Sequence, residues 1–286
     1  MNLAQRVFDD SQTWAGLDRD LSFVPTANAL PKRLTAAQIE QYNSRGYIKN
    51  LPVFDYAQVL EHRSYFDRLL TRQMADGGDA NSLRRMQRFS QPIWDIIVNP
   101  IILDYVEDLL GPNIVAWGQQ YFVKLPGDGK VVSWHQDASY WPFTPARTVT
   151  LWLAVDDADL ENGCMQVIPA THTLGHLDFD MAGREENSVL PQKIHGIERF
   201  GDPVPIDLNA GEISLHADML IHGSAQNSSP RRRAGLTVRY ASTEVRSLDP
   251  NWNQNSIVCR GTDLDDHWAN VPRPEVDYLD LLDSQN

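Results

Sequence analysis

The sequence predicts an α+β protein that is mainly β, with helices first and a β-sandwich or barrel after them. Three stretches before residue 111 have apolar residues at helical spacing and recognisable end signals. From Ile114 onward, short segments with alternating apolar residues are separated by turns rich in Gly, Pro and Asn. Runs of helices followed by runs of strands are typical of an α+β arrangement around a sandwich or barrel.

The helical stretches are defined by their ends. Thr35 followed by Gln38 forms a capping box for a helix that Gly46 terminates. A second helix is expected from about residue 56 to 75. A third covers residues 92–110, where Pro100 breaks it in two.

The strands follow from period-two alternation. They are expected at residues 114–125, 147–155, 166–168, 213–221 and 235–240. Residues 1–33 read as an irregular arm and residues 266–286 as a tail around one domain at 34–265. In that domain, helices extend to about residue 111 and the barrel core spans about 112–243.

Composition narrows the function classes. A formal net charge of -13 argues against general binding of nucleic acid or of an anionic membrane. It does not exclude an anionic small-molecule substrate, because a local arginine cluster can oppose the global charge. Two cysteines, Cys164 and Cys259, allow no disulfide framework. No signal peptide and no run long enough to span a membrane is apparent, so we expect a cytoplasmic protein.

The most informative stretch is His135-Gln136-Asp137. Residues two apart on an extended strand point to the same side, so His135 and Asp137 would face one site. A second imidazole from a distant strand would complete two histidines and one carboxylate, the facial triad of non-haem Fe(II) oxygenases. His222 and His216 both compete for that third position.

Three such ligands could also hold Zn²⁺ for hydrolysis. The two metals differ in the cosubstrate, because iron oxygenases of this kind need a 2-oxoacid whose distal carboxylate requires a guanidinium and a hydroxyl. Arg233 and Ser224 supply these two groups, and a zinc hydrolase needs neither. A barrel that only binds a ligand is the remaining alternative.

Several motifs together resemble the phytanoyl-CoA dioxygenase family of Fe(II)/2-oxoglutarate oxygenases over roughly residues 34–265. In chain order they are Leu34-Thr35, Gly46-Tyr47, His135-Gln136-Asp137, Glu161-Asn162-Gly163-Cys164-Met165, Pro169-Ala170-Thr171-His172, His222-Gly223-Ser224, Arg233 and Arg260-Gly261-Thr262-Asp263. The resemblance implies a double-stranded β-helix, a jelly-roll, cupin-like barrel with bracing N-terminal helices. One departure is Pro169-Ala170-Thr171-His172, where the family more often has Pro-Gly-Ser-His.

The resemblance also implies roles for individual residues. His135, Asp137 and His222 would bind Fe(II), which makes His222 the preferred distal ligand. Arg233 would pair with the C5 carboxylate of 2-oxoglutarate and Ser224 would hydrogen-bond the same end.

Other roles are less determined. Gln119 matches a glutamine that reaches cosubstrate or substrate in relatives, with a structural role or Gln120 as alternatives. Tyr140 and Trp141 stand where relatives place aromatic substrate contacts, although core packing explains them nearly as well. Arg88, with Arg84 and Arg85, is either a solvated surface or part of an anion-binding substrate pocket.

The function expected is oxidation with Fe(II), 2-oxoglutarate and O2, releasing succinate and CO2. Relatives that halogenate lack the carboxylate at the position of Asp137, so its presence favours hydroxylation of an unactivated C–H. A small polar or secondary-metabolite substrate is expected, with an acyl-CoA substrate, desaturation or epoxidation as alternatives. The long polar segment 174–202 is expected to be a lid.

Overall fold

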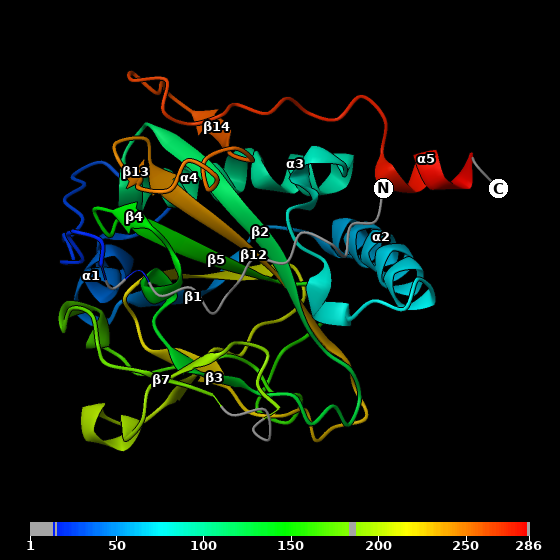
Figure 1. Cartoon of the computed structure of the whole chain (residues 1–286), viewed down its shortest axis with the longest axis horizontal. Helices are drawn as coiled ribbons and strands as arrows, with labels where there is room; N and C mark the ends of the chain where they lie inside the picture. The colour runs from blue at the N-terminus through cyan, green and yellow to red at the C-terminus, as the bar shows by residue number, and fades with distance from the viewer. Residues whose placement is uncertain (1–13, 15, 183–186, 285–286) are drawn as a thin grey trace.

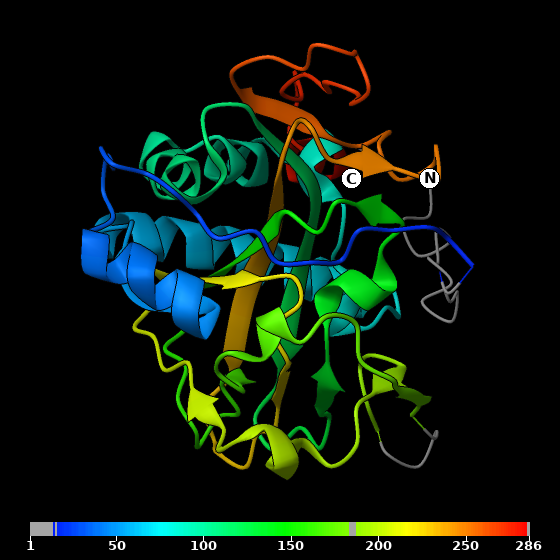
Figure 2. The same cartoon turned by 90° about the vertical axis from the view of Figure 1, so that its left-hand side faces the viewer.

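The computed structural model describes residue 14, residues 16–182 and residues 187–284. Its centre is a large antiparallel sheet, with helices on one face and a smaller antiparallel sheet on the other (Figures 1 and 2). This is the predicted double-stranded β-helix with bracing helices. No described helix combines the length and the apolar character of a membrane span.

The helices before residue 111 begin and end close to the predicted signals, whereas the helix in the C-terminal tail was not expected. The helices are α1 (Ala36–Arg45), α2 (Tyr56–Ala75), α3 (Gln91–Ile97), α4 (Pro100–Leu110) and α5 (Tyr278–Asp283). Both halves of the Thr35–Gln38 capping box are formed, and Gly46 ends α1 with a φ of 83°, a left-handed conformation that glycine adopts readily. Pro100 is the first residue of α4, where its missing N–H costs no hydrogen bond.

The large sheet contains six strands. In spatial order they are β1 (Tyr47–Pro52), β10 (Glu212–Ala217), β5 (Thr148–Ala154), β12 (Arg233–Ser242), β2 (Ile114–Lys124) and β14 (Ile257–Arg260). β1 and β14 come from outside residues 112–243, the range predicted for the barrel core, and pair with β10 and β2. The sheet therefore draws on more of the chain than the alternating region alone.

The small sheet and two ribbons complete the β structure. The small sheet has the order β3 (Val132–His135), β11 (His222–Ser224), β6 (Gln166–Val167) and β9 (Val204–Pro205). The ribbons pair β13 (Arg246–Ser247) with β4 (Phe143–Thr144) and β7 (Asp180–Met181) with β8 (Gln192–Lys193).

The strand predicted at residues 213–221 is shorter in the structure, because a turn follows Ala217. β10 ends at Ala217 in the large sheet, the N–H of Leu220 closes a turn onto the Ala217 carbonyl, and β11 begins at His222 in the small sheet. Asp218 stabilises this crossing because its carboxylate accepts a hydrogen bond from the Thr148 N–H at 3.1 Å. The chain thus passes from one sheet to the other between His216 and His222.

The large sheet has two different faces. Val149, Leu151 and Leu153 of β5 belong to the apolar core shared with the helices. Thr150 and Trp152 alternate with them and line a cavity between the two sheets. Alternate residues of β5 therefore face either the apolar core or the cavity between the sheets.

The described parts of the segment 174–202 contact the small sheet. The N–H of Val189 donates to the carbonyl of Val131, just before β3, and the N–H of Ile194 donates to that of Trp134, within β3. Gly175, Gly196 and Gly201 of this segment have positive φ, whereas Gly183 lies outside the described residues. The role of the segment 174–202 as a lid stays a prediction.

Candidate metal centre and cosubstrate site

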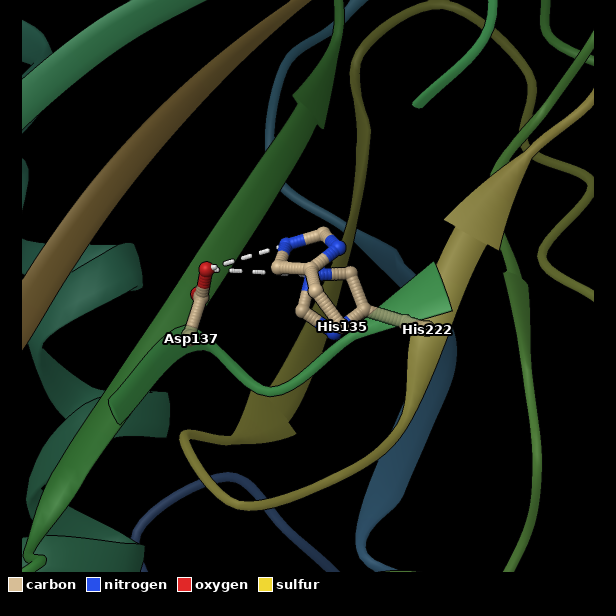
Figure 3. A group of neighbouring side chains, drawn as sticks. All are labelled: His135, Asp137 and His222. Carbon is tan, nitrogen blue, oxygen red and sulfur yellow. Dashed lines mark ion pairs between the residues drawn. The ribbon is translucent and has the colours of Figure 1, made fainter. Parts of the chain in front are cut away.

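Two histidines of the small sheet lie side by side. His135 at the end of β3 is the direct cross-strand partner of His222 at the start of β11. Directly opposed residues on antiparallel strands have neighbouring side chains, and the two ring centroids are 4.1 Å apart. Both imidazoles point toward Asp137 (Figure 3).

Asp137 reaches the histidines from just beyond β3. Gln136 keeps an extended backbone and Asp137 begins a 3-10 turn, so the two-residue spacing works although the strand ends at His135. Asp137 Oδ1 lies 3.5 Å from Nε2 of His135 and 3.8 Å from Nε2 of His222. Ligand atoms from these three buried residues all lie within 4.8 Å of one another.

Hydrogen bonds orient both imidazoles for a metal. Nδ1 of His135 lies 2.7 Å from the Ser133 carbonyl oxygen, and Nδ1 of His222 lies 2.9 Å from that of Leu220. A carbonyl only accepts, so each Nδ1 carries a proton and each Nε2 faces Asp137, the side on which a metal would bind. Burial and the nearby His135 lower the pKa of His222 well below its usual value, which keeps that ring neutral.

Asp137 is held as a carboxylate. Burial by itself raises its pKa, but the imidazoles of His135 and His216 outweigh burial, and the pKa lies well below the usual value. The Thr150 hydroxyl on β5 donates to Asp137 Oδ2 at 2.8 Å. Two imidazoles oriented by hydrogen bonds at Nδ1 and one carboxylate fit a divalent metal and match the Fe(II) facial triad.

His216 lies on the other side of the same carboxylate. Its Nε2 is 3.7 Å from Asp137 Oδ2, and its ring centroid is 4.6 Å from that of His222. Neither of its ring nitrogens has a hydrogen-bond partner among the described residues. The structure brings His222 to Oδ1 beside His135, and leaves His216 beside Oδ2 on the large sheet.

The predicted oxoacid anchors line the same cavity as the metal ligands. The Arg233 guanidinium is buried, with Nε donating to the Gly163 carbonyl at 3.1 Å and Nη1 to the Phe122 carbonyl at 3.2 Å. It stacks 5.6 Å from the Trp152 ring. Ser224 lies two residues beyond His222 in β11, so the structure brings both predicted anchors into the metal cavity.

Lys124 is a residue that the sequence reasoning missed. It pairs directly with Arg233 across β2 and β12, and its buried amine donates to Ser224 Oγ at 2.7 Å and to the Ala225 carbonyl. Burial, followed by the charge of Arg233, lowers its pKa to about 6. In the described part of the chain, neither Lys124 nor Arg233 forms an ion pair with a carboxylate, so this end of the cavity is suited to an anion.

The sequence does contain a signal for Lys124 and Thr150. Lys124 shares the strand face of Gln120 and Phe122, and Thr150 shares that of Trp152, whereas Val149, Leu151 and Leu153, which alternate with Thr150, are apolar. Polar side chains on the inward parity of a barrel strand mark the cavity.

Gln119 has a different environment from the anchors. Its Oε1 accepts a hydrogen bond from the Met86 N–H at 3.0 Å, and both Gln119 and Gln120 line a second cavity adjacent to the metal cavity. Tyr140 and Trp141 line this second cavity as well, and Tyr140 packs edge-on to His135 with ring centroids 5.6 Å apart.

The three arginines Arg84, Arg85 and Arg88 do not lie in one place. Arg84 and Arg85 line the second cavity. Arg88 is exposed and donates to Asn255 Oδ1 at 3.2 Å. The structure therefore does not bring Arg88 together with the other predicted site residues.

Comparison with known proteins agrees with this geometry. Residues 31–235 match the family model described as phytanoyl-CoA dioxygenase (PhyH). The peroxisomal phytanoyl-CoA dioxygenase of Mus musculus is 28% identical over 257 residues, which cover 79% of this chain and 74% of the mouse protein.

Solved structures share the fold. The non-haem monooxygenase ThoJ superposes with a TM-score of 0.71 at 22% identity, covering 86% of this chain and 92% of ThoJ. The epimerase SnoN, solved with Fe3+, α-ketoglutarate and nogalamycin RO, superposes with a TM-score of 0.63 at 20% identity, covering 85% of this chain and 96% of SnoN. With this family match and the His-Asp-His cluster, the chain belongs to the phytanoyl-CoA dioxygenase family of non-haem Fe(II)/2-oxoglutarate-dependent oxygenases.

Proposed function

We propose that this protein hydroxylates an unactivated C–H bond of a small polar or secondary-metabolite substrate, with release of succinate and CO2. The observation that carries the proposal is the carboxylate of Asp137, which completes the two-histidine, one-carboxylate set on one side of the cavity. Retention of that carboxylate favours hydroxylation over halogenation. Iron and 2-oxoglutarate, when bound, supply the activation of O2 that C–H oxidation requires.

The residues of the chain would bind and orient these groups. His135, Asp137 and His222 would hold the metal on one face, which leaves its other positions for cosubstrate and O2. Arg233 and Ser224 would hold the distal carboxylate of the oxoacid at the far end of the cavity. Lys124 would donate to the same carboxylate or to Ser224, and a bound anion would favour its protonated form.

Anaerobic titration of the protein with Fe(II) and 2-oxoglutarate tests the cosubstrate assignment. The weak visible charge-transfer band of the iron–oxoacid chelate should appear and saturate at one equivalent of each. If the band does not form with freshly loaded Fe(II), the assignment is wrong.

Substitution of Asp137 by alanine tests the catalytic assignment. Asp137→Ala should abolish succinate release in the presence of O2 and any active substrate, because one of three metal ligands is lost. Asp95→Ala is the matched control, since Asp95 is an exposed carboxylate paired with Arg273 at 2.6 Å. Succinate release by Asp137→Ala at the rate of the unmodified protein would overturn the proposal.

A further inference from the structure

The N-terminal arm contacts the segment of chain that follows the metal ligand Asp137. Residues 16–30 precede the match to the family, which begins at residue 31, so the family match does not cover this part of the arm. The described residues of the arm, drawn in dark blue, run across the face of the molecule shown in Figure 2. Their hydrogen bonds converge on the chain between Asp137 and β5.

The turn that contains Asp137 is short and depends on contacts from outside. Asp137 is the first residue of a 3-10 helix that ends at Tyr140, and helices of this kind have poor hydrogen-bond geometry. The N–H of Ala138, the residue after the ligand, donates to the Asp218 carbonyl at 2.9 Å. At the other end of the turn, Tyr140 packs edge-on to the ring of His135, a second ligand. A shift of this turn would therefore displace Asp137 and change the packing of His135.

Arg19 of the arm binds the carbonyl groups of this turn. Its Nη1 donates to the Ala138 carbonyl at 2.9 Å and to the Trp141 carbonyl at 2.6 Å. A guanidinium stays charged at neutral pH, and hydrogen bonds from a charged donor are stronger than those between neutral groups. The indole Nε1 of Trp14 donates to the Tyr140 carbonyl at 3.0 Å. Together with the hydrogen bond at its N–H, both backbone groups of Ala138 are thus held in place.

The next residues of the arm hold the chain that follows the turn. The N–H of Asp20 donates to Thr144 Oγ1 at 2.9 Å, and the Asp20 carbonyl accepts from the Ala146 N–H at 2.8 Å. Leu21 packs against the buried side chains of Ala138 and Ala146. The arm therefore holds the turn and both of its ends against the body of the domain.

The position of these contacts indicates a role in metal binding. A metal site requires its ligands to be held close to one geometry, and the groups behind the ligands influence its affinity. We propose that Arg19 is a positioning residue for the metal: by holding the turn that contains Asp137, the arm sets the metal affinity of the site. The inference rests on the metal centre and is independent of the substrate.

Substitution of Arg19 tests the proposal through metal binding, without turnover. The Fe(II) affinity of the full chain is measured under anaerobic conditions by competition with a chelator of known affinity. Arg19→Met roughly keeps the length of the side chain and removes its donors, so it should weaken Fe(II) binding about tenfold. Arg19→Lys retains a charged donor and should restore most of the affinity.

A second arginine of the arm provides the matched control. Arg33 contacts α4, with its Nε 3.5 Å from Asp104 Oδ2 and its guanidinium carbon 5.5 Å from the Tyr105 ring centroid. Arg33→Met makes the same chemical change away from the turn that contains Asp137, and should leave the Fe(II) affinity unchanged. A loss of affinity that came only from general destabilisation would appear in both variants.

Hydrogen exchange reports the contact between the arm and the chain after the turn. The N–H groups of Asp20 and Ala146 join the two, so their exchange follows local opening of the arm. Loading with Fe(II) should slow their exchange several-fold, and Arg19→Met should remove most of this slowing. Trp14→Phe keeps an aromatic ring and loses the donor to the Tyr140 carbonyl, so it should have a smaller effect in the same direction.

Three outcomes would contradict the proposal. They are an unchanged Fe(II) affinity in Arg19→Met, an equal loss of affinity in Arg33→Met, and exchange at Asp20 and Ala146 that does not respond to the metal. If the unmodified protein binds no Fe(II), the assignment of the metal centre itself is wrong. The proposed hydroxylation is tested separately by succinate release, and its failure would leave this inference standing.

Discussion

Both carboxylate oxygens of Asp137 have neighbours within the protein. Oδ1 faces the two imidazoles of the small sheet, and Oδ2 accepts a hydrogen bond from Thr150 on the large sheet. A partner behind a ligating group fixes its orientation, and removal of such partners commonly lowers metal affinity by about 10- to 100-fold.

Thr150→Val should therefore weaken iron binding by about tenfold, because it preserves shape and removes the hydroxyl donor. Competition with a chelator of known affinity measures the change. Thr150→Ser keeps a donor and should restore most of the affinity. Thr148→Val, two residues away on the same strand face, should have little effect, and an equal loss in this control would contradict the prediction.

Lys124 gives the metal-free protein a distinctive pH dependence. Its pKa of about 6 in the folded state lies below the ordinary lysine value of 10.5, so between these values the unfolded chain binds one more proton. The free energy of unfolding then rises with pH, by about 1.4 kcal/mol per pH unit from this group.

Lys124→Met removes this contribution. The metal-free variant should be more stable than the unmodified protein near pH 7 by roughly 2 to 4 kcal/mol, and the difference should shrink toward pH 10. Affinity for 2-oxoglutarate should fall in the same variant. Urea unfolding at several pH values measures the stability. Identical slopes against pH for the two proteins would show that Lys124 is not held neutral.

At the scale of elements, the turn after β6 contains a residue under strain. Ala170 has a φ of 68°, its N–H donates to the Arg45 carbonyl at 3.0 Å, and its side chain is exposed. This is the position at which the family more often has glycine, the residue that adopts this conformation without a steric cost. Alanine in place of glycine therefore strains the backbone of this turn, and the strain does not affect the metal-binding residues.

Ala170→Gly should stabilise the protein by about 0.5 to 1 kcal/mol, since relief of the left-handed strain exceeds the added entropy of the unfolded chain. Ala37→Gly in the exposed face of α1 makes the same chemical change on regular backbone and should destabilise by about 1 kcal/mol. Thermal unfolding of the two variants gives the comparison. Destabilisation by both would rule out strain at Ala170.

Some of the helices and strands could be predicted from the sequence and others could not. Helix ends were predicted well because Thr35, Gln38, Gly46 and Pro100 act through local backbone chemistry. The passage of the chain from Ala217 in the large sheet to His222 in the small sheet was not predicted, because sheet membership depends on contacts that are distant in sequence. The small sheet was also hard to predict, because its strands have only two to four residues.

For the site, spacing predicted the pair of His135 and Asp137, and the family resemblance selected His222. The strand face of Lys124 is visible in the sequence, but its role at the anion end of the cavity is not, because its partner Arg233 is recognised only from the register of β2 and β12. The direct pairing of two basic residues is unfavourable without an anion. Once the register is known, such a pair therefore indicates a site for an anion.

At the scale of the whole molecule, the metal ligands and oxoacid anchors come from both sheets. His135, His222 and Ser224 belong to the small sheet. Arg233 belongs to the large sheet, as does Thr150, whose hydroxyl donates a hydrogen bond to Asp137. A metal and an oxoacid would therefore link the sheets, and ligands that bind only the folded state stabilise it.

Fe(II) with 2-oxoglutarate, each at about 100 times its dissociation constant, should raise the midpoint of thermal unfolding by roughly 5 to 10 °C under anaerobic conditions. Removal of the metal with a chelator should reverse the shift. Asp137→Ala should show almost none of it. A shift of full size in that variant would mean that the stabilising metal binds elsewhere.

The wall that the two cavities share has a thermodynamic consequence. Asp137 contributes to both, so any occupant of the second cavity that changes the free energy of this carboxylate also changes the affinity of the metal. Linkage requires reciprocity: if the occupant tightens the metal by some factor, the metal must tighten the occupant by the same factor. Metal affinity measured across a library of candidate compounds would thus rank how strongly each is coupled to the metal, and the physiological substrate could be sought without observing a single turnover.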